Sequence, residues 1–227
     1  MKRVAFTMLE LVTVIVILGI LASLALPRIE RDFRQEAADT ILSAIRYTQH
    51  MALSDNVTNP SNNNWQQAFW RFGIEGCSDD GIFYYIGADK DTEGNIDSKE
   101  AAIDPSNGMR MNGLNTKPCQ SDLSRQNQAS ADIFLTKKYG ISEGGVVFSG
   151  CNNTAGKYIG FDHLGRPHRG FVQNSSGIGG SISPDYGSLC TSDMTITLKF
   201  DDTSIADISI TVEKETGYAY ISTQENS

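Results

Sequence analysis

An apolar run at the start of the chain, Val4–Leu26, restricts the fold more than any other feature. It carries one charge, Glu10, and as a helix it would be long enough, at ~1.5 Å per residue, to cross a bilayer. Lys2 and Arg3 precede it, so the tendency of basic residues to stay inside predicts a cytoplasmic N-terminus and places everything after Pro27 outside. The run therefore predicts a single-pass membrane helix that carries the rest of the chain on the far side.

A cleaved secretory signal peptide is the alternative for this run, since Ser23-Leu24-Ala25 offers small residues for a cleavage site. Glu10 argues against it. A carboxylate within an apolar membrane segment costs roughly 2–3 kcal/mol, and such a residue is retained where it has a partner. The sequence therefore favours a helix that stays on the mature protein.

The residues around Glu10 carry a more specific signal. Ala5-Phe6-Thr7-Met8-Leu9-Glu10-Leu11 resembles the cleavage and methylation motif of type IV prepilins and type II secretion pseudopilins. The resemblance implies that a prepilin peptidase removes residues 1–5, cutting between Ala5 and Phe6, and methylates the new amino group. Ala5 departs from the family pattern, which usually has glycine here, so we expect slower cleavage at worst.

Glu10 would remain in the mature stem after this cleavage. Phe6 lies one helical turn before it, so the new ammonium and the carboxylate share a face. In a filament, Glu10 of one subunit can pair with the Phe6 ammonium of its neighbour, and two opposite charges buried together cost far less than one alone. The resemblance thus assigns Glu10 to assembly, with other pilin or pseudopilin subunits, the prepilin peptidase and the bacterial inner membrane as partners.

The segment that follows Pro27 is amphipathic. Apolar residues recur every three or four positions over Ile29–Ala52, with charged residues elsewhere on the wheel, which is typical of a helix with one buried stripe. We expect one helical stem over residues 6–54, transmembrane to about Leu26, kinked at Pro27 and ended by Ser54-Asp55-Asn56.

Residues 55–227 are predicted to form a β-rich head. Short runs of β-branched and aromatic residues mark candidate strands at Gln67–Ile74, Ile82–Ile86, Val146–Phe148, Tyr158–Phe161, Met194–Phe200, Ile205–Val212 and Tyr218–Ile221. The last three look like a meander, and residues 88–135 are interpreted as a polar insertion. The predicted fold class is α+β: a long N-terminal helical stem, half transmembrane and half amphipathic, packed on an antiparallel β head in the manner of a pilin.

All four cysteines lie in the predicted head, and none forms a CxxC pair, which argues against zinc or thioredoxin-like chemistry. An even, widely spaced set fits two disulfides in an oxidising compartment, with four reduced core thiols as the alternative. Three pairings are open. We prefer Cys77–Cys119, which brackets the polar insertion, and Cys151–Cys190, which flanks the central strands.

The sharpest chemical signal in the head is the acidic segment Asp89–Glu100. It matches a calcium loop of twelve residues, with glycine at the sixth position. The predicted calcium ligands are Asp89, Asp91, Glu93, Asn95, Asp97 and Glu100. However, Glu93 is long for its position, and a strand pattern rather than a helix precedes the loop. A solvated acidic hairpin tip therefore stays open as the alternative.

A small basic turn, Gly165–Arg169, stands out in a protein of net charge −8 and pI near 4.9. An acidic surface repels phosphate backbones, so DNA could be held only by a local basic patch. Some DNA-uptake minor pilins carry a Gly-Arg-x-Arg phrase that Arg166 and Arg169 resemble, with the second arginine displaced by one position. The sequence favours the other interpretation, a tight turn in which Arg166 bonds locally.

No catalytic phrase surrounds His50, His163 or His168, so the sequence does not predict an enzyme. Ile159–Pro167 resembles a phrase of H-type minor pseudopilins and related minor pilins. The resemblance implies a minor pilin or pseudopilin, a structural subunit of a type II secretion pseudopilus or type IV pilus that assembles through its N-terminal helix and has a periplasmic head. The alternative is a minor pilin that binds DNA during DNA uptake.

Overall fold

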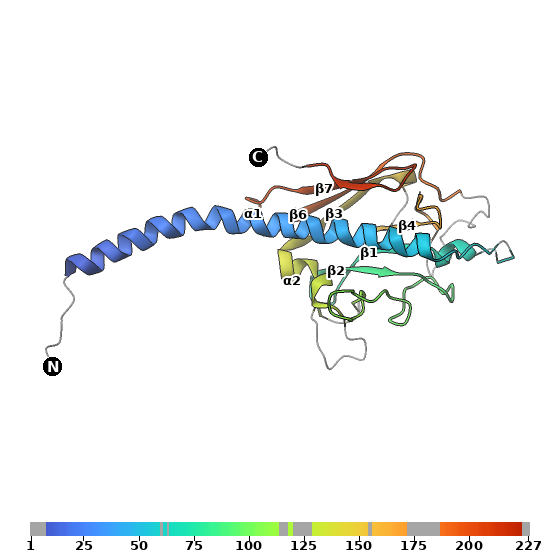
Figure 1. Ribbon diagram of the computed structural model, residues 1–227, viewed down its shortest axis with the longest axis horizontal. Helices are drawn as coiled ribbons and strands as arrows, with labels where there is room; N and C mark the ends of the chain where they lie inside the picture. The colour runs from blue at the N-terminus through green and yellow to red at the C-terminus, as the bar shows by residue number, and fades with distance from the viewer. Residues whose placement is uncertain are drawn as a thin grey trace.

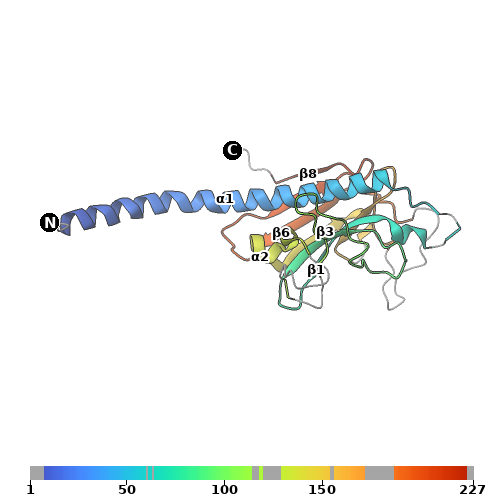
Figure 2. The ribbon, with the colours of Figure 1, turned by 60° about the horizontal axis from the view of Figure 1, so that its bottom comes forward.

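The computed structural model describes residues 8–59, 61–62, 64–113, 118–119, 129–153, 156–171 and 187–223, with the side chains of residues 22–32 outside this description. A helix, α1 (Met8–Ser54), lies against a head of two four-stranded antiparallel sheets. The second part of α1 runs along the head, and its first part extends clear of it (Figures 1 and 2). α1 continues as a helix through Pro27, the residue at which the sequence predicts a kink.

The second part of α1 packs through one stripe. Ala37, Ile41, Ala44, Ile45 and Ala52 are all less than 5% exposed and recur at the three- to four-residue spacing that the sequence shows. Small residues in this stripe let the helix approach the sheets closely. α1 ends at Ser54, next to the predicted end at the Ser54-Asp55-Asn56 stop.

Three side chains of α1 also tie it to the head by hydrogen bonds to backbone carbonyls. Arg34 donates to the carbonyl oxygens of Ala206 (2.9 Å) and Asp207 (3.0 Å). Arg46 donates to the Ala219 carbonyl at 2.8 Å. Gln49 Nε2 reaches one carbonyl in each half of the head, at Gly165 and Thr216, both at 2.8 Å. The helix is therefore fixed to both sheets.

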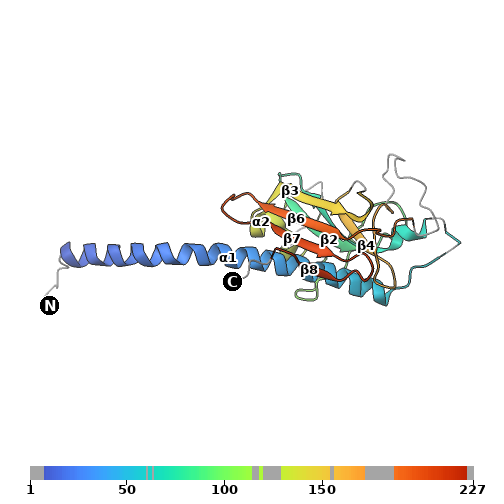
Figure 3. The ribbon, with the colours of Figure 1, turned by 90° about the horizontal axis from the view of Figure 1, so that it is seen from above.

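The two sheets have separate strand sets, and Figure 3 shows both beside α1. The first has the order β2-β1-β4-β5 and contains β1 (Trp70–Gly76), β2 (Ile82–Gly87), β4 (Tyr158–Phe161) and β5 (Pro167–His168). The second has the order β3-β6-β7-β8 and contains β3 (Ile141–Gly150), β6 (Met194–Phe200), β7 (Ile208–Val212) and β8 (Ala219–Ile221). Short helical elements connect them: η1 (Trp65–Ala68), η2 (Ala131–Ile133), α2 (Leu135–Tyr139) and η3 (Cys151–Asn153).

Most predicted strands are found, with shifted ends. The bounds predicted for β4 and β6 match, and β6 alternates buried and more exposed residues as a strand with one core face should. The run predicted from Gln67 begins as the 3₁₀ turn η1, and the strand starts only at Trp70. The segment interpreted as an insertion contributes to the core, because Ile133, Phe134 and Leu135 are at most 2% exposed.

The predicted transmembrane half of the stem is corrected. Among the described residues, no helix combines the length and the apolar character needed to cross a membrane. The pilin-like fold class with a transmembrane half is therefore wrong, and so is the localisation as a single-pass inner-membrane protein with a cytoplasmic N-terminus and a periplasmic head.

Candidate functional site

The first described residues of α1, Met8–Leu21, form an apolar surface that the head leaves uncovered; we call it the apolar helix segment. Its large hydrophobic side chains are all exposed, from 47% for Val14 to 87% for Met8. Single exposed leucines are ordinary, but a helix that is apolar on all sides is normally buried. A contiguous apolar surface of this kind marks a contact with another molecule.

Glu10 lies in the first turn of α1, within this apolar helix segment. Ala5 and Phe6, the predicted cleavage site, lie outside the described residues. The processing at Phe6 and the assembly role of Glu10 therefore stay predictions. Thr13 turns its hydroxyl back on the helix and donates to the carbonyl oxygens of Leu9 (3.0 Å) and Glu10 (2.9 Å), so its polar group is satisfied without water.

The acidic loop Asp89–Glu100 brings together three of its six predicted ligands. Carboxylate oxygens of Asp89, Asp91 and Glu100 lie within 4.8 Å of one another. These are the first, third and twelfth positions of the calcium-loop pattern. Glu93 and Asp97 are exposed and lie outside this trio. The carbonyl of Asn95 stays a predicted ligand.

Backbone N–H groups of the loop hold the trio in place. Asp89 accepts from the N–H groups of Glu93 (3.1 Å) and Gly94 (2.8 Å). Glu100 accepts from Lys90 N–H at 2.7 Å and, through its other oxygen, from Asp97 N–H at 2.9 Å. Gly94 has φ 96°, a conformation that residues with a Cβ rarely adopt, so glycine is required at the bend.

Burial makes Asp89 the unusual member of the trio. It is fully buried, and this desolvation raises its pKa from 3.8 to about 6, against the lowering effect of the Gly94 N–H and of the nearby Arg71 charge. A side-chain hydrogen bond with the exposed Asp91 and the negative charge of the half-buried Glu100 raise this pKa further. A divalent cation at this place would offset the desolvation cost of the ionised form and its repulsion by Glu100.

The basic turn Gly165–Arg169 is held together from inside. Arg166 pairs with the buried Asp162 carboxylate at 2.7 Å. The same carboxylate accepts from the N–H groups of Leu164 (3.0 Å) and Arg166 (2.9 Å). Burial alone would raise the pKa of Asp162, but hydrogen bonds from His168 and Arg166 lower it to about 2. Arg166 thus bonds locally, as the preferred interpretation of the sequence expects.

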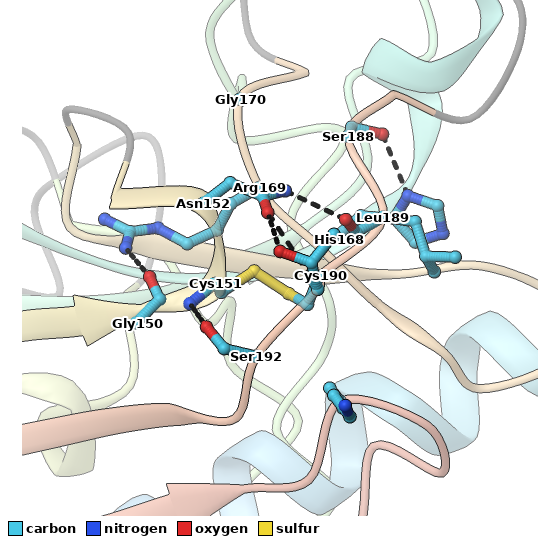
Figure 4. Close-up of a disulfide and its surroundings, with 12 residues drawn as sticks. Gly150, Cys151, Asn152, His168, Arg169, Gly170, Ser188, Leu189, Cys190 and Ser192 are labelled. Atoms are coloured by element: carbon cyan, nitrogen blue, oxygen red, sulfur yellow. Dashed lines mark hydrogen bonds between the residues drawn. A yellow bond between two sulfur atoms is a disulfide. The ribbon is translucent and has the colours of Figure 1, made fainter.

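Arg169 is buried and only 2% exposed. Its guanidinium donates to the carbonyl oxygens of Gly150 (3.2 Å) and Gly156 (2.6 Å) and lies over the Phe148 ring, 5.8 Å from its centroid. Figure 4 shows the arginine extended toward Gly150, beside the Cys151–Cys190 disulfide. The Arg169 side chain therefore connects the end of β3 in one sheet with the segment that precedes β4 in the other.

Both disulfides form, in the pairing that the sequence analysis prefers. Cys77–Cys119 connects the end of β1 with the segment after residue 88, and Cys151–Cys190 connects the ends of two loops beside β3 and β6. The linked residues are 42 and 39 positions apart. Each bridge is expected to stabilise the head by roughly 2–4 kcal/mol.

Ser188 and Gln66, which the sequence analysis missed, complete a buried chain of hydrogen bonds. Ser188 Oγ donates to Gln66 Oε1 at 2.7 Å and contacts His168 Nδ1 at 2.8 Å, while His168 Nε2 lies 3.3 Å from Asp162. Burial lowers the pKa of His168, in spite of Asp162. The serine is only 8% exposed and its hydrogen is engaged by an amide, so the chain fastens η1 to the basic turn rather than presenting a nucleophile.

Sequence spacing does not indicate this chain of hydrogen bonds, because Gln66 and Ser188 are 122 residues apart. The other histidines stay apart from it. His50 is exposed on α1, and His163 Nδ1 lies 3.4 Å from the Thr58 hydroxyl.

Compared with known proteins, the chain matches no family model, no curated protein and no solved structure.

Proposed function

We propose that this chain is a type IV pilin-like subunit, a minor pilin or pseudopilin, that assembles into a filament of the type II secretion or type IV pilus kind. The single observation that carries the proposal is the exposed apolar helix segment, Met8–Leu21. The resemblance of Ala5–Leu11 to the prepilin motif supports the same function from the sequence.

Packing on equivalent helices of neighbouring subunits is the role proposed for the apolar helix segment. Burying a Leu, Ile or Val side chain fully stabilises by roughly 1.5–3 kcal/mol, and these side chains are about half exposed. Contact along several turns therefore supplies enough free energy for a stable subunit interface. Glu10 sits within this contact and pairs with the amino group of Phe6 on the neighbour, because two opposite charges buried together cost far less than one alone.

Assembly of the full-length chain tests the proposal. Ile15 is 60% exposed, and Ile15→Asp should abolish oligomers and filaments, seen by sedimentation and electron microscopy, while the melting temperature of the head stays unchanged. Lys214→Asp, an exposed charge change on the head, is the matched control and should assemble normally. Filaments formed equally well by Ile15→Asp would refute the proposal.

Processing supplies a second test, of the family resemblance itself. The intact mass of the mature chain should correspond to a start at methylated Phe6. Glu10→Gln should be cleaved normally and assemble poorly, because cleavage reads the junction and assembly needs the charge. A mature chain that begins near Leu26 would contradict the proposal, since the apolar helix segment would be lost.

We also propose that the acidic loop binds Ca²⁺ as a structural cofactor. The support is the convergence of Asp89, Asp91 and Glu100 at the positions that lead and close the calcium-loop pattern. Carboxylate and carbonyl oxygens are the ligands that Ca²⁺ prefers. The ion would stiffen a loop on the surface of the head.

DNA binding through Arg166 and Arg169 is not proposed, because no observation favours it. Arg166 pairs with Asp162, and Arg169 is buried against backbone carbonyls. Neither guanidinium is in a position to contact phosphates without breaking these bonds. The acidic net charge of −8 opposes DNA binding as well.

A further inference from the structure

A groove of about 640 Å³ lies between one face of α1 and the edge of the head. Its α1 wall consists of residues spaced three and four apart, from Glu36 through Asp39 and Ser43 to Tyr47, so one helical face lines it. Tyr84 of β2, Asp104 and Met111 form the opposite side. The volume is in the range of sites that hold a small molecule or a side chain.

The charge of this groove is strongly negative. Four carboxylates line it, those of Glu36, Asp39, Asp104 and Asp132, against one cation, Lys138. Lys138 lies 3.3 Å from Glu36 and 2.6 Å from Asp132, so it pairs with these two. Asp39 and Asp104 are not paired with a described cation.

Asp104 keeps its negative charge although it is buried. Burial would raise its pKa, but hydroxyls of Ser130 and Ser106, the Ser106 N–H and the Asn107 amide lower it. All of these donors are neutral, so they stabilise the carboxylate without cancelling its charge. Asp39 is exposed and accepts from another neutral donor, Gln35, at 3.0 Å. The groove therefore offers two uncompensated negative charges.

Tyr84 supplies an independent sign of a ligand. Its side chain is only 2% exposed, it lines the groove, and its hydroxyl makes no hydrogen bond to any residue within the described ranges. The carboxylates of Asp104 and Asp132 lie close enough to raise its pKa, after burial itself. The hydroxyl oxygen itself is open to the groove, so a donor brought by a ligand can form a hydrogen bond with it in place of water.

The groove also has an apolar part. Ala44, Met111 and the ring of Tyr47 lie along it, beside the carboxylates. A bare metal ion would use the charges alone, whereas a flexible chain with a cationic head would use both parts. Lys138 demonstrates this mode within the protein, because its ammonium sits between two carboxylates and 5.1 Å from the centre of the Tyr139 ring.

We propose that this groove is a docking site for an arginine or lysine side chain of another protein subunit. The cationic head pairs with Asp39 and Asp104 and donates to the Tyr84 hydroxyl, while its methylene stem packs on Met111 and Tyr47. Charge complementarity identifies the occupant, and the position on α1 makes the groove accessible to a subunit that packs beside this helix. The inference does not depend on the apolar helix segment, so its failure would leave the proposed function standing.

Binding of a minimal peptide to the full-length chain tests this proposal. The probe is acetyl-Gly-Arg-Gly-amide, with acetyl-Gly-citrulline-Gly-amide as the uncharged control, and the readout is NMR of ¹³C-labelled tyrosine rings. The arginine peptide should shift the Tyr84 signal, identified by its absence in Tyr84→Phe, and the citrulline peptide should not. Equal shifts with both peptides, or none with either, would overturn the proposal.

Two variants and one control sharpen the result. Asp39→Asn should weaken binding about two- to fivefold, the range of a partly exposed ion pair. Tyr84→Phe, followed by calorimetry, should weaken it about tenfold, since a hydrogen bond to a charged group is lost. Glu215→Gln, which changes an exposed carboxylate outside the groove, should bind as the wild type does.

Spermidine is a further probe, which separates a free polyamine from a side chain of a partner. If spermidine shifts the Tyr84 signal and the arginine peptide does not, the site takes a free polyamine and the docking proposal fails.

Discussion

The acidic loop Asp89–Glu100 and the basic turn Gly165–Arg169 are both short charged segments beside strands of the same sheet, yet the fold treats them differently. In the basic turn, Arg166 pairs with Asp162, and Arg169 is buried against carbonyl oxygens. In the acidic loop, three carboxylates converge and accept hydrogen bonds from backbone N–H groups. The charge of Arg71 lowers the pKa of Asp89, but none of the three forms an ion pair with a described residue. One segment balances its charge inside the head, while the other gathers carboxylates for which we propose a cation from outside.

This difference shows what a charged segment in a sequence can mean. A cluster whose counter-charges come from the fold is structural, whatever binding motif it resembles. A cluster that the fold gathers without counter-charges is a candidate binding site. The same criterion separates Lys138 and its two carboxylates from Asp39 and Asp104 in the groove.

Removal of Asp162 should have the largest effect. Asp162→Ala leaves Arg166 and His168 without their shared carboxylate, and breaking a buried charge pair costs roughly 3–5 kcal/mol of unfolding free energy. Denaturant unfolding measures the loss. Asp202→Ala is the matched control, because Asp202 also accepts from the N–H two residues on but is exposed, and its unfolding free energy should change little. Equal losses in both variants would show that the pair of Asp162 and Arg166 does not stabilise the basic turn, and the contrast with the acidic loop would fail.

Calcium should have the next largest effect. Saturating the acidic loop at a hundredfold excess over the dissociation constant would stabilise the head by roughly 2.7 kcal/mol, seen as a rise in melting temperature relative to chelator. Asp91→Asn should abolish most of this rise, since it removes a ligand of the trio that is exposed and not needed for folding. Asp202→Asn should respond to Ca²⁺ as the wild type does. A wild-type midpoint that ignores millimolar Ca²⁺ would make the loop a solvated hairpin tip.

A smaller effect is expected from Asp89, in the pH dependence of the free energy of unfolding. The pKa of Asp89 is about 6 in the folded head, against an ordinary value of 3.8, so the folded state holds the proton more tightly. In chelator, this residue therefore contributes stability at low pH that is lost as pH rises from about 4 to about 6. With Ca²⁺ the slope should reverse, because the ion binds the ionised carboxylate. Asp89→Asn should remove the difference, and a wild-type profile identical to that of the variant would contradict the assignment.

The smallest expected effect concerns DNA. The full-length chain should bind a DNA duplex weakly at physiological salt, and Arg166→Gln should change this binding less than twofold. Filter binding at two salt concentrations measures both. Tight binding with a steep salt dependence that Arg166→Gln reduces would show that the basic turn opens toward phosphates, and would promote the DNA-uptake function.

Regular patterns made much of the fold predictable from the sequence. The stripe of Ala37, Ile41 and Ile45 and the alternation within Met194–Phe200 follow the periods of a helix and a strand. β5 was missed because two residues, one of them Pro167, carry no periodicity. Ile133–Leu135 was missed as core because a short apolar run inside a polar segment is too brief to show a pattern.

The candidate sites were predictable only where their residues are close in sequence. The trio Asp89, Asp91 and Glu100 belongs to one loop, so its pattern is visible in the chain. The groove around Tyr84 and the partners of Arg169 come from segments far apart, and no local spacing announces them. The transmembrane half failed for another reason: the apolar run indicates that Met8–Leu21 avoids water, but not which partner covers it.

The hydrogen bonds that Arg34, Arg46 and Gln49 make to the head have a mechanical consequence. They attach α1 at several points along its length and reach backbone carbonyls beside or within both sheets. Tension applied along the helix is therefore shared among these bonds and the packed stripe between them, which must shear together instead of peeling one after another. A subunit pulled by its N-terminal helix would transmit the force into both sheets while the head stays folded.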